Sequence, residues 1–396
     1  MSIRTQVGII GAGPAGLTLA NILSAEGIDC VVVEKRSRSH VENRARAGLV
    51  EPRTVAALDR YGLADGLLAH GVPHRSCEFR RDGERFSLPY GMLTDGRQHL
   101  VYPQQRLVAD LIAAREAAGG ILHFSHPAVS LGVADLPAGG KITVESAASG
   151  ERIDIECDVI AGCDGFHGIS RRAVPEKRLR PVVKQHDSAW LAVLADAPPS
   201  THEIVYALHN EGYAGHMLRT PTISRYYLQC PLGDAAEQWS DDRIWSALDR
   251  RLSAPDWKLN TGEITQRSVL DMRSYMSSRM DFGNLFLVGD AAHIITPAGG
   301  KGMNLAIADA VELASSLLAY FAGDERRIRS YSALRIADTW QCQEFSHWLL
   351  QLLHTPAPEA GDHSFMSSLQ SARLDRLRSH PSYATAFAES YVGPAH

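Results

Sequence analysis

Apolar residues follow two different spacings along the first part of the chain. Residues 6–10 (QVGII) and 29–34 (DCVVVE) are short, nearly continuous apolar runs, which predict buried strands. Residues 17–26 carry apolar positions at helical spacing, and Gly27 follows them as a helix stop. The start of the chain therefore predicts a strand–helix–strand unit, which is typical of a parallel sheet covered by helices.

The same two spacings recur later in the chain. Residues 202–208 and 225–231 are rich in β-branched and aromatic residues and predict strands. Residues 303–319 and 327–354 have apolar positions at helical spacing and predict two long helices. No internal repeat or low-complexity linker separates these patterns, so we expect the domains to be interleaved along the sequence.

A glycine-rich turn joins the first predicted strand to the first predicted helix. Gly11, Gly13 and Gly16 have the spacing at which a strand turns tightly into a helix and lets a pyrophosphate approach the positive end of the helix dipole. Glu34 follows Gly16 by 18 residues and ends the second strand, where a carboxylate accepts hydrogen bonds from an adenosine ribose. This arrangement predicts a dinucleotide site, which fits either FAD or NAD.

Two aspartates follow later apolar strands. Asp164 comes after the run 159–162, and Asp290 comes after the run 285–288. Ligands of open α/β sheets bind at the carboxyl ends of the strands, so Asp290 is placed to hold the ribityl hydroxyls of a flavin. The alternative is that Asp290 only caps the helix that follows. The glycine-rich turn 297–302 adds backbone amides that stabilise negative charge on an isoalloxazine ring.

Composition narrows the class of protein. The chain has 396 residues, with 40 basic and 45 acidic side chains and a formal net charge of −5, which argues against a nucleic-acid binder that relies on a general basic field. No apolar run approaches the roughly 20 residues that cross a bilayer. The six cysteines are scattered, and His293 has no neighbouring ligands at metal spacing, so we assign no metal. We expect a cytoplasmic enzyme without a membrane segment.

Longer motifs carry a family resemblance that covers essentially the whole chain. The sequence resembles the single-component flavoprotein aromatic hydroxylases, and within them it is most similar to the 4-hydroxybenzoate 3-monooxygenase branch. The residues that carry this resemblance are GAGPAG (11–16), RARAGLVEPRTV (44–55), CDGFHGISR (163–171), WLAVLADAPP (190–199), SRYYLQCPL (224–232), GDAAHIITPAGGKGMNLA (289–306) and ESYVG (389–393).

The resemblance implies an α/β fold with an α+β second domain, in which a doubly wound FAD-binding domain is interleaved with a mixed-sheet substrate domain and followed by C-terminal helices. It also implies a homodimer. The expected regions are 1–72, 97–180 and 270–320 for the FAD-binding domain, 73–96 and 181–269 for the substrate domain, and 321–396 for the C-terminal helical region.

The resemblance also implies a reaction. FAD reduced by NADPH, or by NADH, reacts with O2 to form a flavin C4a-hydroperoxide, which hydroxylates the electron-rich ring of a 4-hydroxybenzoate-type phenolic acid. Tyr206 and Tyr391 match the tyrosines that bind the phenol oxygen and relay its proton, and Pro297 matches a carbonyl contact to that oxygen. Arg219 and Tyr227 match the residues that bind the substrate carboxylate.

Two positions of the expected substrate pocket depart from the family pattern. Met217, preceded by His216, stands where a serine normally helps to hold the carboxylate, and Thr296 replaces a proline before Pro297. One interpretation is an ordinary 4-hydroxybenzoate hydroxylase with tolerated substitutions. The other is a hydroxylase of a ring-substituted relative such as 3-amino-4-hydroxybenzoate, acting next to the amine, which His216 or Thr296 would contact.

The remaining matches concern the two nucleotides. Trp190 matches a residue at the gate of a mobile flavin, and Arg225 matches an arginine near the flavin. By resemblance and by the motifs above, the expected FAD contacts are Gly11, Gly13, Gly16, Glu34, Arg46, Gln104, Asp164, Asp290, Gly302 and Asn304. The expected NADPH contacts are Lys35, Arg36, Arg44, His167, Arg171 and Arg273.

Overall fold

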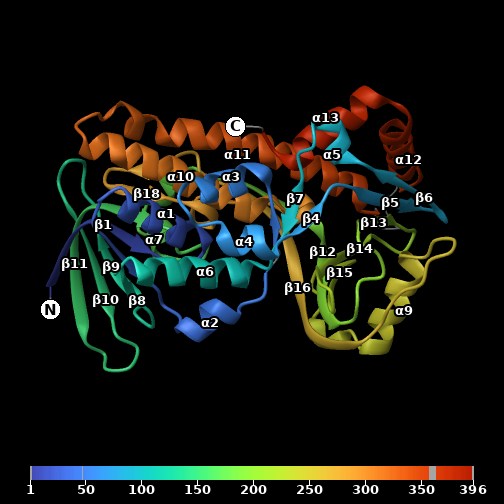
Figure 1. Cartoon of the computed structure of the whole chain (residues 1–396), viewed down its shortest axis with the longest axis horizontal. Coiled ribbons are helices and arrows are strands. Elements are labelled where there is room, and N and C mark those ends of the chain that lie inside the picture. The colour runs from blue at the N-terminus through green and yellow to red at the C-terminus, as the bar shows by residue number, and fades with distance from the viewer. Residues whose placement is uncertain (1, 47, 356–362, 395–396) are drawn as a thin grey trace.

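Two large sheets lie side by side along the long axis of the molecule, joined by long strands and covered by helices (Figure 1). The computed structural model describes residues 2–46, 48–355 and 363–394. Both sheets and their helices form the α/β architecture with a mixed second sheet that the sequence predicts.

The first sheet is built around a parallel core. Strand β1 (Ser2–Ile10) pairs in parallel with β2 (Cys30–Val33) on one side and with β11 (Arg152–Gly162) on the other. The predicted strand–helix–strand unit is confirmed, because α1 (Pro14–Ala25) connects β1 to β2. The sheet also contains β8 (Ile121–His123), β9 (Ala128–Gly132), β10 (Gly140–Glu145), β17 (Asp281–Phe282) and β18 (Leu285–Leu287).

The second sheet is mixed and mostly antiparallel. Its strand order is β19-β16-β12-β15-β14-β13-β5-β6, and β13 pairs with β5 in parallel. Its strands are β5 (Cys77–Arg81), β6 (Glu84–Leu88), β12 (Val182–Asp196), β13 (Ile204–Leu208), β14 (Ala214–Thr220), β15 (Ile223–Pro231), β16 (Glu263–Met276) and β19 (His293–Ile294). The strands predicted over 202–208 and 225–231 are therefore confirmed as β13 and β15.

One expected domain boundary cuts a strand. The division at 269/270 falls inside β16, which pairs with β12 from Asp196 to Val182 and so belongs to the second sheet along its whole length. Residues 270–276 therefore lie with the second sheet rather than with the first. The physical reason is that β12 and β16 are long enough to run from one half of the molecule into the other (Figure 1).

A three-stranded sheet of β3 (Leu49–Val50), β4 (Val72–His74) and β7 (His99–Val101) accompanies the two large ones. Long C-terminal helices pack along the top of the molecule in Figure 1. The helices are α2 (Arg38–Asn43), α3 (Pro52–Arg60), α4 (Asp65–His70), α5 (Tyr90–Leu93), α6 (Gln104–Ala117), α7 (Ile169–Arg172), α8 (Glu176–Leu179), α9 (Asp241–Arg251), α10 (Lys301–Phe321), α11 (Arg326–Leu353), α12 (His363–Ser379) and α13 (Pro381–Val392).

One helix among the described residues is apolar and long enough to pass a length-and-composition test for a membrane span. It covers Ala298–Phe321, and half of its most apolar window is buried inside the protein. It packs against α1 and α11, and its buried residues include Leu305, Ile307 and Leu313. These contacts are those of a core helix of the protein.

Candidate active site

The glycine-rich turn after β1 has two closed positions and one open position. Gly11 has φ +109°, and a Cβ there would lie 2.4 Å from the Cys163 carbonyl oxygen. A Cβ on Gly16 would lie 2.0 Å from the Gly11 oxygen, whereas one on Gly13 would meet no heavy atom within 4 Å. Gly13 is also the N-cap of α1, and no side chain caps the helix. The free amides of α1 therefore face open space of the kind that a pyrophosphate fills.

Gly13→Ala is expected to weaken FAD binding by about tenfold or more while the apoprotein keeps its melting temperature within about 2 °C. The backbone at Gly13 (φ −83°) accommodates a side chain without strain, so the added methyl group obstructs only the ligand. Flavin titration of the apoprotein and its thermal unfolding measure the two quantities. Gly16→Ala is the contrasting variant, because its clash lowers both, and unchanged FAD affinity in Gly13→Ala would contradict the assignment.

The carboxylates expected at the flavin are held by the backbone around them. Glu34 accepts hydrogen bonds from the Ala12 N–H at 2.9 Å and the Arg36 N–H at 2.8 Å, so it braces the glycine-rich turn. Asp164 accepts a hydrogen bond from the Ser170 N–H at 2.9 Å, and its other carboxylate oxygen is buried without a partner in the described structure. Burial raises the pKa of Asp164. A hydroxyl donor of a ligand would satisfy this oxygen.

Asp290 lies in the turn η2 (Gly289–Ala291) that directly follows β18, and its side chain is accessible. Desolvation by the surrounding protein raises its pKa, and His293, followed by Arg46 and Arg44, acts in the opposite direction. The accessible Asp290 carboxylate can accept hydrogen bonds from a ligand that carries several hydroxyls. These donors and acceptors fit the FAD that the sequence implies.

The other expected FAD contacts differ in their position and in how much of the residue is free to meet a ligand. Gln104 begins α6 and is half-buried, and Gly302 lies in the first turn of α10. The Asn304 side chain accepts a hydrogen bond from the Glu51 N–H at 2.8 Å and donates one to the Leu49 oxygen at 2.9 Å. The Asn304 side chain therefore holds β3 against α10, which leaves its backbone as the group that a cofactor would meet.

Tyr206 and Tyr391 come together although 185 residues separate them. Their hydroxyl oxygens lie 2.9 Å apart, Tyr391 is fully buried, and Tyr206 is 6% exposed. Burial raises the pKa of both phenols. Both tyrosines therefore keep their protons at neutral pH and form a hydrogen-bonded pair that can pass a proton.

The expected carboxylate contacts lie on the same face of the second sheet. In the sheet register Tyr206 is opposite Gly215, and Gly215 is opposite Tyr227. Arg219 lies on β14, is 6% exposed, and donates to Gln105 Oε1 at 2.6 Å. A small cavity is lined by Met217, Arg219 and Arg225 together with Gly48, Leu49, Val101, Pro103 and Leu218.

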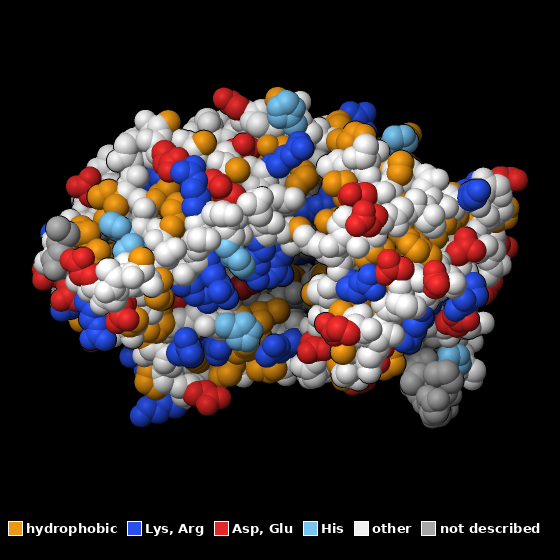
Figure 2. All heavy atoms as spheres, turned by 90° about the horizontal axis from the view of Figure 1, so that it is seen from below, with side chains coloured by type: hydrophobic (Ala, Val, Ile, Leu, Met, Phe, Trp, Pro, Cys, Tyr) orange, Lys and Arg blue, Asp and Glu red, His pale blue; other side chains and the backbone are white. Residues whose placement is uncertain are grey.

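Several arginines concentrate positive charge at this place. Burial and then the nearby Arg225 lower the pKa of Arg219 to about 10, which leaves its guanidinium charged at neutral pH. Burial and then Arg44 lower the pKa of Arg46, and Arg225 adds to that effect. Figure 2 shows Lys and Arg side chains gathered beside a hollow in one face of the molecule. Mutually destabilised cations of this kind attract anionic ligands.

Two of the expected substrate contacts point elsewhere. His216 pairs with Val205 and Tyr226, which lie on the opposite face of the sheet from Met217, and its Nε2 accepts the Ser200 N–H at 3.2 Å. Thr296 is 1% exposed, and its hydroxyl bonds to the Ser346 hydroxyl on α11 at 2.7 Å. Both substrate-contact predictions are therefore corrected. Pro297, by contrast, is accessible in the turn before α10.

A buried polar cluster that the sequence does not predict lies beside Tyr391. The Tyr90 oxygen lies 3.1 Å from His74 Nδ1 and 3.0 Å from His99 Nδ1, and its hydroxyl donates to the His74 carbonyl at 2.6 Å. The Tyr90 and His99 rings pack edge-on against Tyr391, with centroids 5.0 and 5.1 Å away. His99 Nε2 is buried and has no hydrogen-bond partner among the described residues. No local motif marks this cluster, because its members come from β4, α5 and β7.

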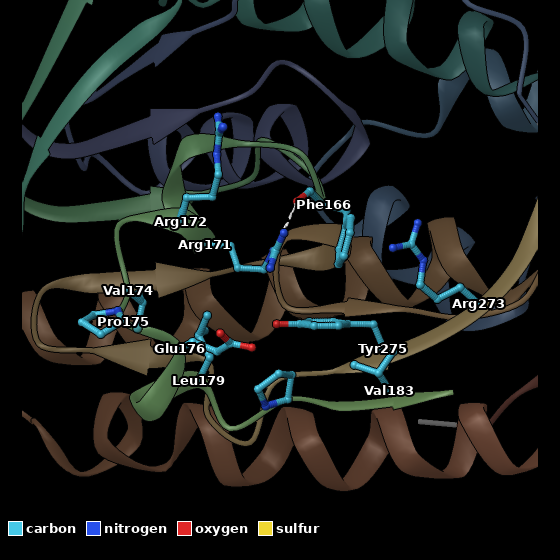
Figure 3. Close-up of a pocket in the computed structure, with 11 residues that line it drawn as sticks. Phe166, Arg171, Arg172, Val174, Pro175, Glu176, Leu179, Val183, Arg273 and Tyr275 are labelled. Atoms are coloured by element: carbon cyan, nitrogen blue, oxygen red, sulfur yellow. Dashed lines mark hydrogen bonds between the residues drawn. The ribbon is translucent and has the colours of Figure 1, made fainter. Parts of the chain in front are cut away.

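A surface pocket of about 500 Å³ brings two of the expected NADPH contacts together. Arg171 lies over the Phe166 ring at 4.1 Å and donates to its carbonyl, and Arg273 lies over the same ring at 4.7 Å. Figure 3 shows both arginines beside Phe166 and Tyr275, with Glu176 on the other side. His167 is exposed next to this pocket in sequence.

The basic residues that follow β2, Lys35, Arg36 and Arg38, are not all available to bind a phosphate. Lys35 and Arg36 are exposed, as is Arg44. Arg38, however, is paired with Glu42 at 2.8 Å and Glu116 at 2.9 Å, which neutralises its charge. The run therefore offers a phosphate fewer free cations than its composition indicates.

Comparisons with known proteins show which family the chain belongs to. The FAD binding domain family matches residues 4–346. The p-hydroxybenzoate hydroxylase of Acinetobacter baylyi is 39% identical over 394 residues, which are 99% of this chain and 96% of that protein. A 3-amino-4-hydroxybenzoate 2-monooxygenase of Streptomyces platensis is 27% identical over 358 residues, covering 84% of each chain. The crystal structure of p-nitrophenol 4-monooxygenase from Pseudomonas putida has a TM-score of 0.78 over 100% of both chains at 18% identity, a likeness of fold alone.

The family match spans most of the chain, and the 39% identity extends over nearly its full length. The open glycine turn and the unpartnered Asp164 oxygen suit the cofactor that this family binds. The chain therefore belongs to the FAD-dependent aromatic hydroxylases, flavoprotein monooxygenases that use FAD with NAD(P)H as the reductant.

Proposed function

We propose that this enzyme hydroxylates the ring of a 4-hydroxybenzoate-type phenolic acid. The observation that carries the proposal is the buried Tyr206–Tyr391 pair, placed one strand away from Gly215 and two from Tyr227 in the same sheet. A phenol bound at Tyr206 and a carboxylate bound at Tyr227 and Arg219 give the substrate one orientation. When bound, FAD takes electrons from NAD(P)H and activates O2 for transfer of one oxygen atom.

The protein's own contribution is to remove the phenol proton in a dry pocket. The substrate hydroxyl donates to Tyr206, Tyr206 passes a proton to Tyr391, and the ring gains the electron density that favours oxygen transfer. Because burial raises the pKa of both tyrosines, neither stays ionised at neutral pH. Each hydroxyl therefore relays a proton, giving up its own as it accepts another.

The proton then needs an acceptor beyond Tyr391. His99 Nε2 is buried without a partner among the described residues, and the ring packs against Tyr391. Burial, and then the charge of Lys301, lower the pKa of His99 well below its usual range, so His99 would pass a proton on rather than keep it. Tyr90 links His99 to His74, and burial lowers the pKa of His74 to about 4, so His74 is neutral at pH 7. We propose that this cluster extends the proton path from the tyrosine pair.

The cofactor and reductant sites follow from the same geometry. The amides at Gly13, the carboxylates of Glu34, Asp164 and Asp290, and the guanidinium of Arg46 would hold FAD. The pocket between Arg171 and Arg273 would receive NADPH, because it offers two cations and an aromatic platform. By family resemblance we also propose a homodimer in the cytoplasm.

Met217→Ser is expected to tighten 4-hydroxybenzoate binding by about fivefold if a missing hydrogen bond limits the carboxylate site. The methionine side chain offers no useful donor and lies in the cavity that Arg219 also lines. The dissociation constant and the product formed per NADPH are the measurements. Met217→Ala is the matched control, because it removes the same bulk without adding a hydroxyl. An equal effect of both variants would contradict the hydrogen-bond explanation.

The second candidate is a ring-substituted substrate such as 3-amino-4-hydroxybenzoate, which is in the name of one relative. Met217 supports this alternative because it changes the carboxylate end of the pocket. The corrected positions of His216 and Thr296 remove both residues as contacts to the amine.

Ligand binding to the FAD-loaded protein tests the proposed orientation. Absorbance changes of the flavin should saturate with 4-hydroxybenzoate. Phenol, which lacks the carboxylate, should bind at least about tenfold more weakly because it cannot use Arg219. Equal affinity for the two compounds would contradict the assignment of the carboxylate end.

A further inference from the structure

Gly215 creates a gap between the two tyrosines that anchor the proposed substrate. Tyr206, Gly215 and Tyr227 lie opposite one another on three neighbouring strands, and their side chains therefore share one face of the sheet. Gly215 has no side chain to fill the middle of this row. The surface between the phenol end and the carboxylate end would otherwise carry a third side chain.

The Tyr213 hydroxyl occupies this gap. Tyr213 lies two residues before Gly215 and so points to the same face. A Cβ added to Gly215 would lie 2.2 Å from the Tyr213 hydroxyl oxygen. The hydroxyl therefore stands where a side chain at position 215 would begin, between Tyr206 and Tyr227.

The Tyr213 ring is held in place by its neighbours. Its N–H donates to Gln229 Oε1 at 3.0 Å, and its carbonyl accepts the Gln229 N–H at 2.8 Å. Its ring centroid lies 4.7 Å from that of Trp190 and 6.5 Å from that of Tyr206. Tyr213 is 2% exposed, and its hydroxyl oxygen is not one of the fully buried, unpartnered polar atoms of the described residues, so the oxygen keeps some of that exposure. A fixed hydroxyl that remains accessible is available to a ligand group.

We propose that Tyr213 is a specificity-determining residue that hydrogen-bonds an amino or hydroxyl substituent on the substrate ring, at a carbon between the carboxyl-bearing and hydroxyl-bearing positions. This inference rests on the proposed function, because Tyr206 and Tyr227 define the two ends of the ring. A ligand held at both ends presents its intermediate carbons to the row containing Gly215. The substrate class is then a 4-hydroxybenzoate with an additional polar substituent on the ring.

The chemistry of the pocket would let the protein distinguish a ring-substituted acid from unsubstituted 4-hydroxybenzoate. A site with a buried polar group loses binding energy when the ligand leaves that group unpaired. Unsubstituted 4-hydroxybenzoate has only C–H groups at these ring positions and leaves the Tyr213 hydroxyl without a partner. An amine or hydroxyl there both donates and accepts, and a tyrosine hydroxyl does the same.

The test compares dissociation constants of the FAD-loaded protein for 4-hydroxybenzoate, 3-amino-4-hydroxybenzoate and 3,4-dihydroxybenzoate. Tyr213→Phe should weaken binding of at least one substituted acid by about tenfold and change that of 4-hydroxybenzoate by less than about twofold. Tyr226→Phe is the matched control. It removes a buried hydroxyl from the same sheet, but its side chain is on the other face and donates to the Asn260 carbonyl at 3.1 Å.

A second variant tests the gap itself. Gly215→Ala should displace the Tyr213 hydroxyl and reduce the preference for the substituted acid without abolishing binding of 4-hydroxybenzoate. Equal losses for all three acids in Tyr213→Phe, or no loss for any of them, would overturn the inference. Failure of the wild-type protein to bind any of these acids would instead overturn the proposed function, so the two failures are distinguishable.

Discussion

Tyr206→Phe is expected to slow hydroxylation by about 10²- to 10⁴-fold, the range typical of a lost proton-transfer group. Substrate binding should change far less, because Arg219 and Tyr227 still hold the carboxylate. The variant loses the hydroxyl that lies 2.9 Å from the Tyr391 oxygen, so the phenol proton has no route away from the ring. NADPH is then consumed with release of hydrogen peroxide, and the product formed per NADPH measures the loss.

Two further variants separate this role from packing. Tyr391→Phe should give a similar loss of coupling, because it interrupts the same path one step later. Tyr226→Phe, on the opposite face of the sheet, should remain fully coupled. A wild-type ratio of product to NADPH in Tyr206→Phe would remove this tyrosine from the proton path.

Arg219→Ala has the second large effect that we expect. It should weaken binding of the acid substrate by about 2–5 kcal/mol, since it leaves a carboxylate unpaired in a buried site. Arg219 is 6% exposed, and its guanidinium remains charged at neutral pH because burial lowers its pKa only to about 10. Titration of the flavin absorbance with 4-hydroxybenzoate gives the dissociation constant.

The loss should be confined to ligands that carry the carboxylate. Phenol should bind wild-type and Arg219→Ala protein equally, and Arg219→Lys should recover part of the affinity because it restores the charge without the planar fork. If Arg219→Ala bound 4-hydroxybenzoate as tightly as the wild-type protein, the carboxylate would have to lie elsewhere.

The fold could be predicted from the sequence because its signals are local. The glycines at 11, 13 and 16 identify the turn, and the structure explains two of them by close approaches of 2.4 and 2.0 Å. The boundary at 270 was wrong for a physical reason, since β16 continues through it and pairs with β12. Hydrophobic pattern alone does not show where a strand passes from one half of a molecule to the other.

The pocket was harder to predict than the fold. His216 and Met217 are neighbours in sequence, but successive side chains of a strand point to opposite faces, so only one of them reaches the cavity. Thr296 was misplaced because its partner, Ser346, is on a helix 50 residues away. Tyr90, His99 and Tyr213 carry no motif, and their importance comes only from what the fold places beside them.

The most direct test of the account is product analysis with the purified FAD-loaded protein, NADPH and O2. We predict that 4-hydroxybenzoate or a ring-substituted relative, 3-amino-4-hydroxybenzoate in the first instance, stimulates NADPH oxidation. The matching product should gain one oxygen atom by mass, and that atom should come from ¹⁸O₂. NADPH oxidation that neither acid stimulates, with no oxygenated product, would contradict the proposed function.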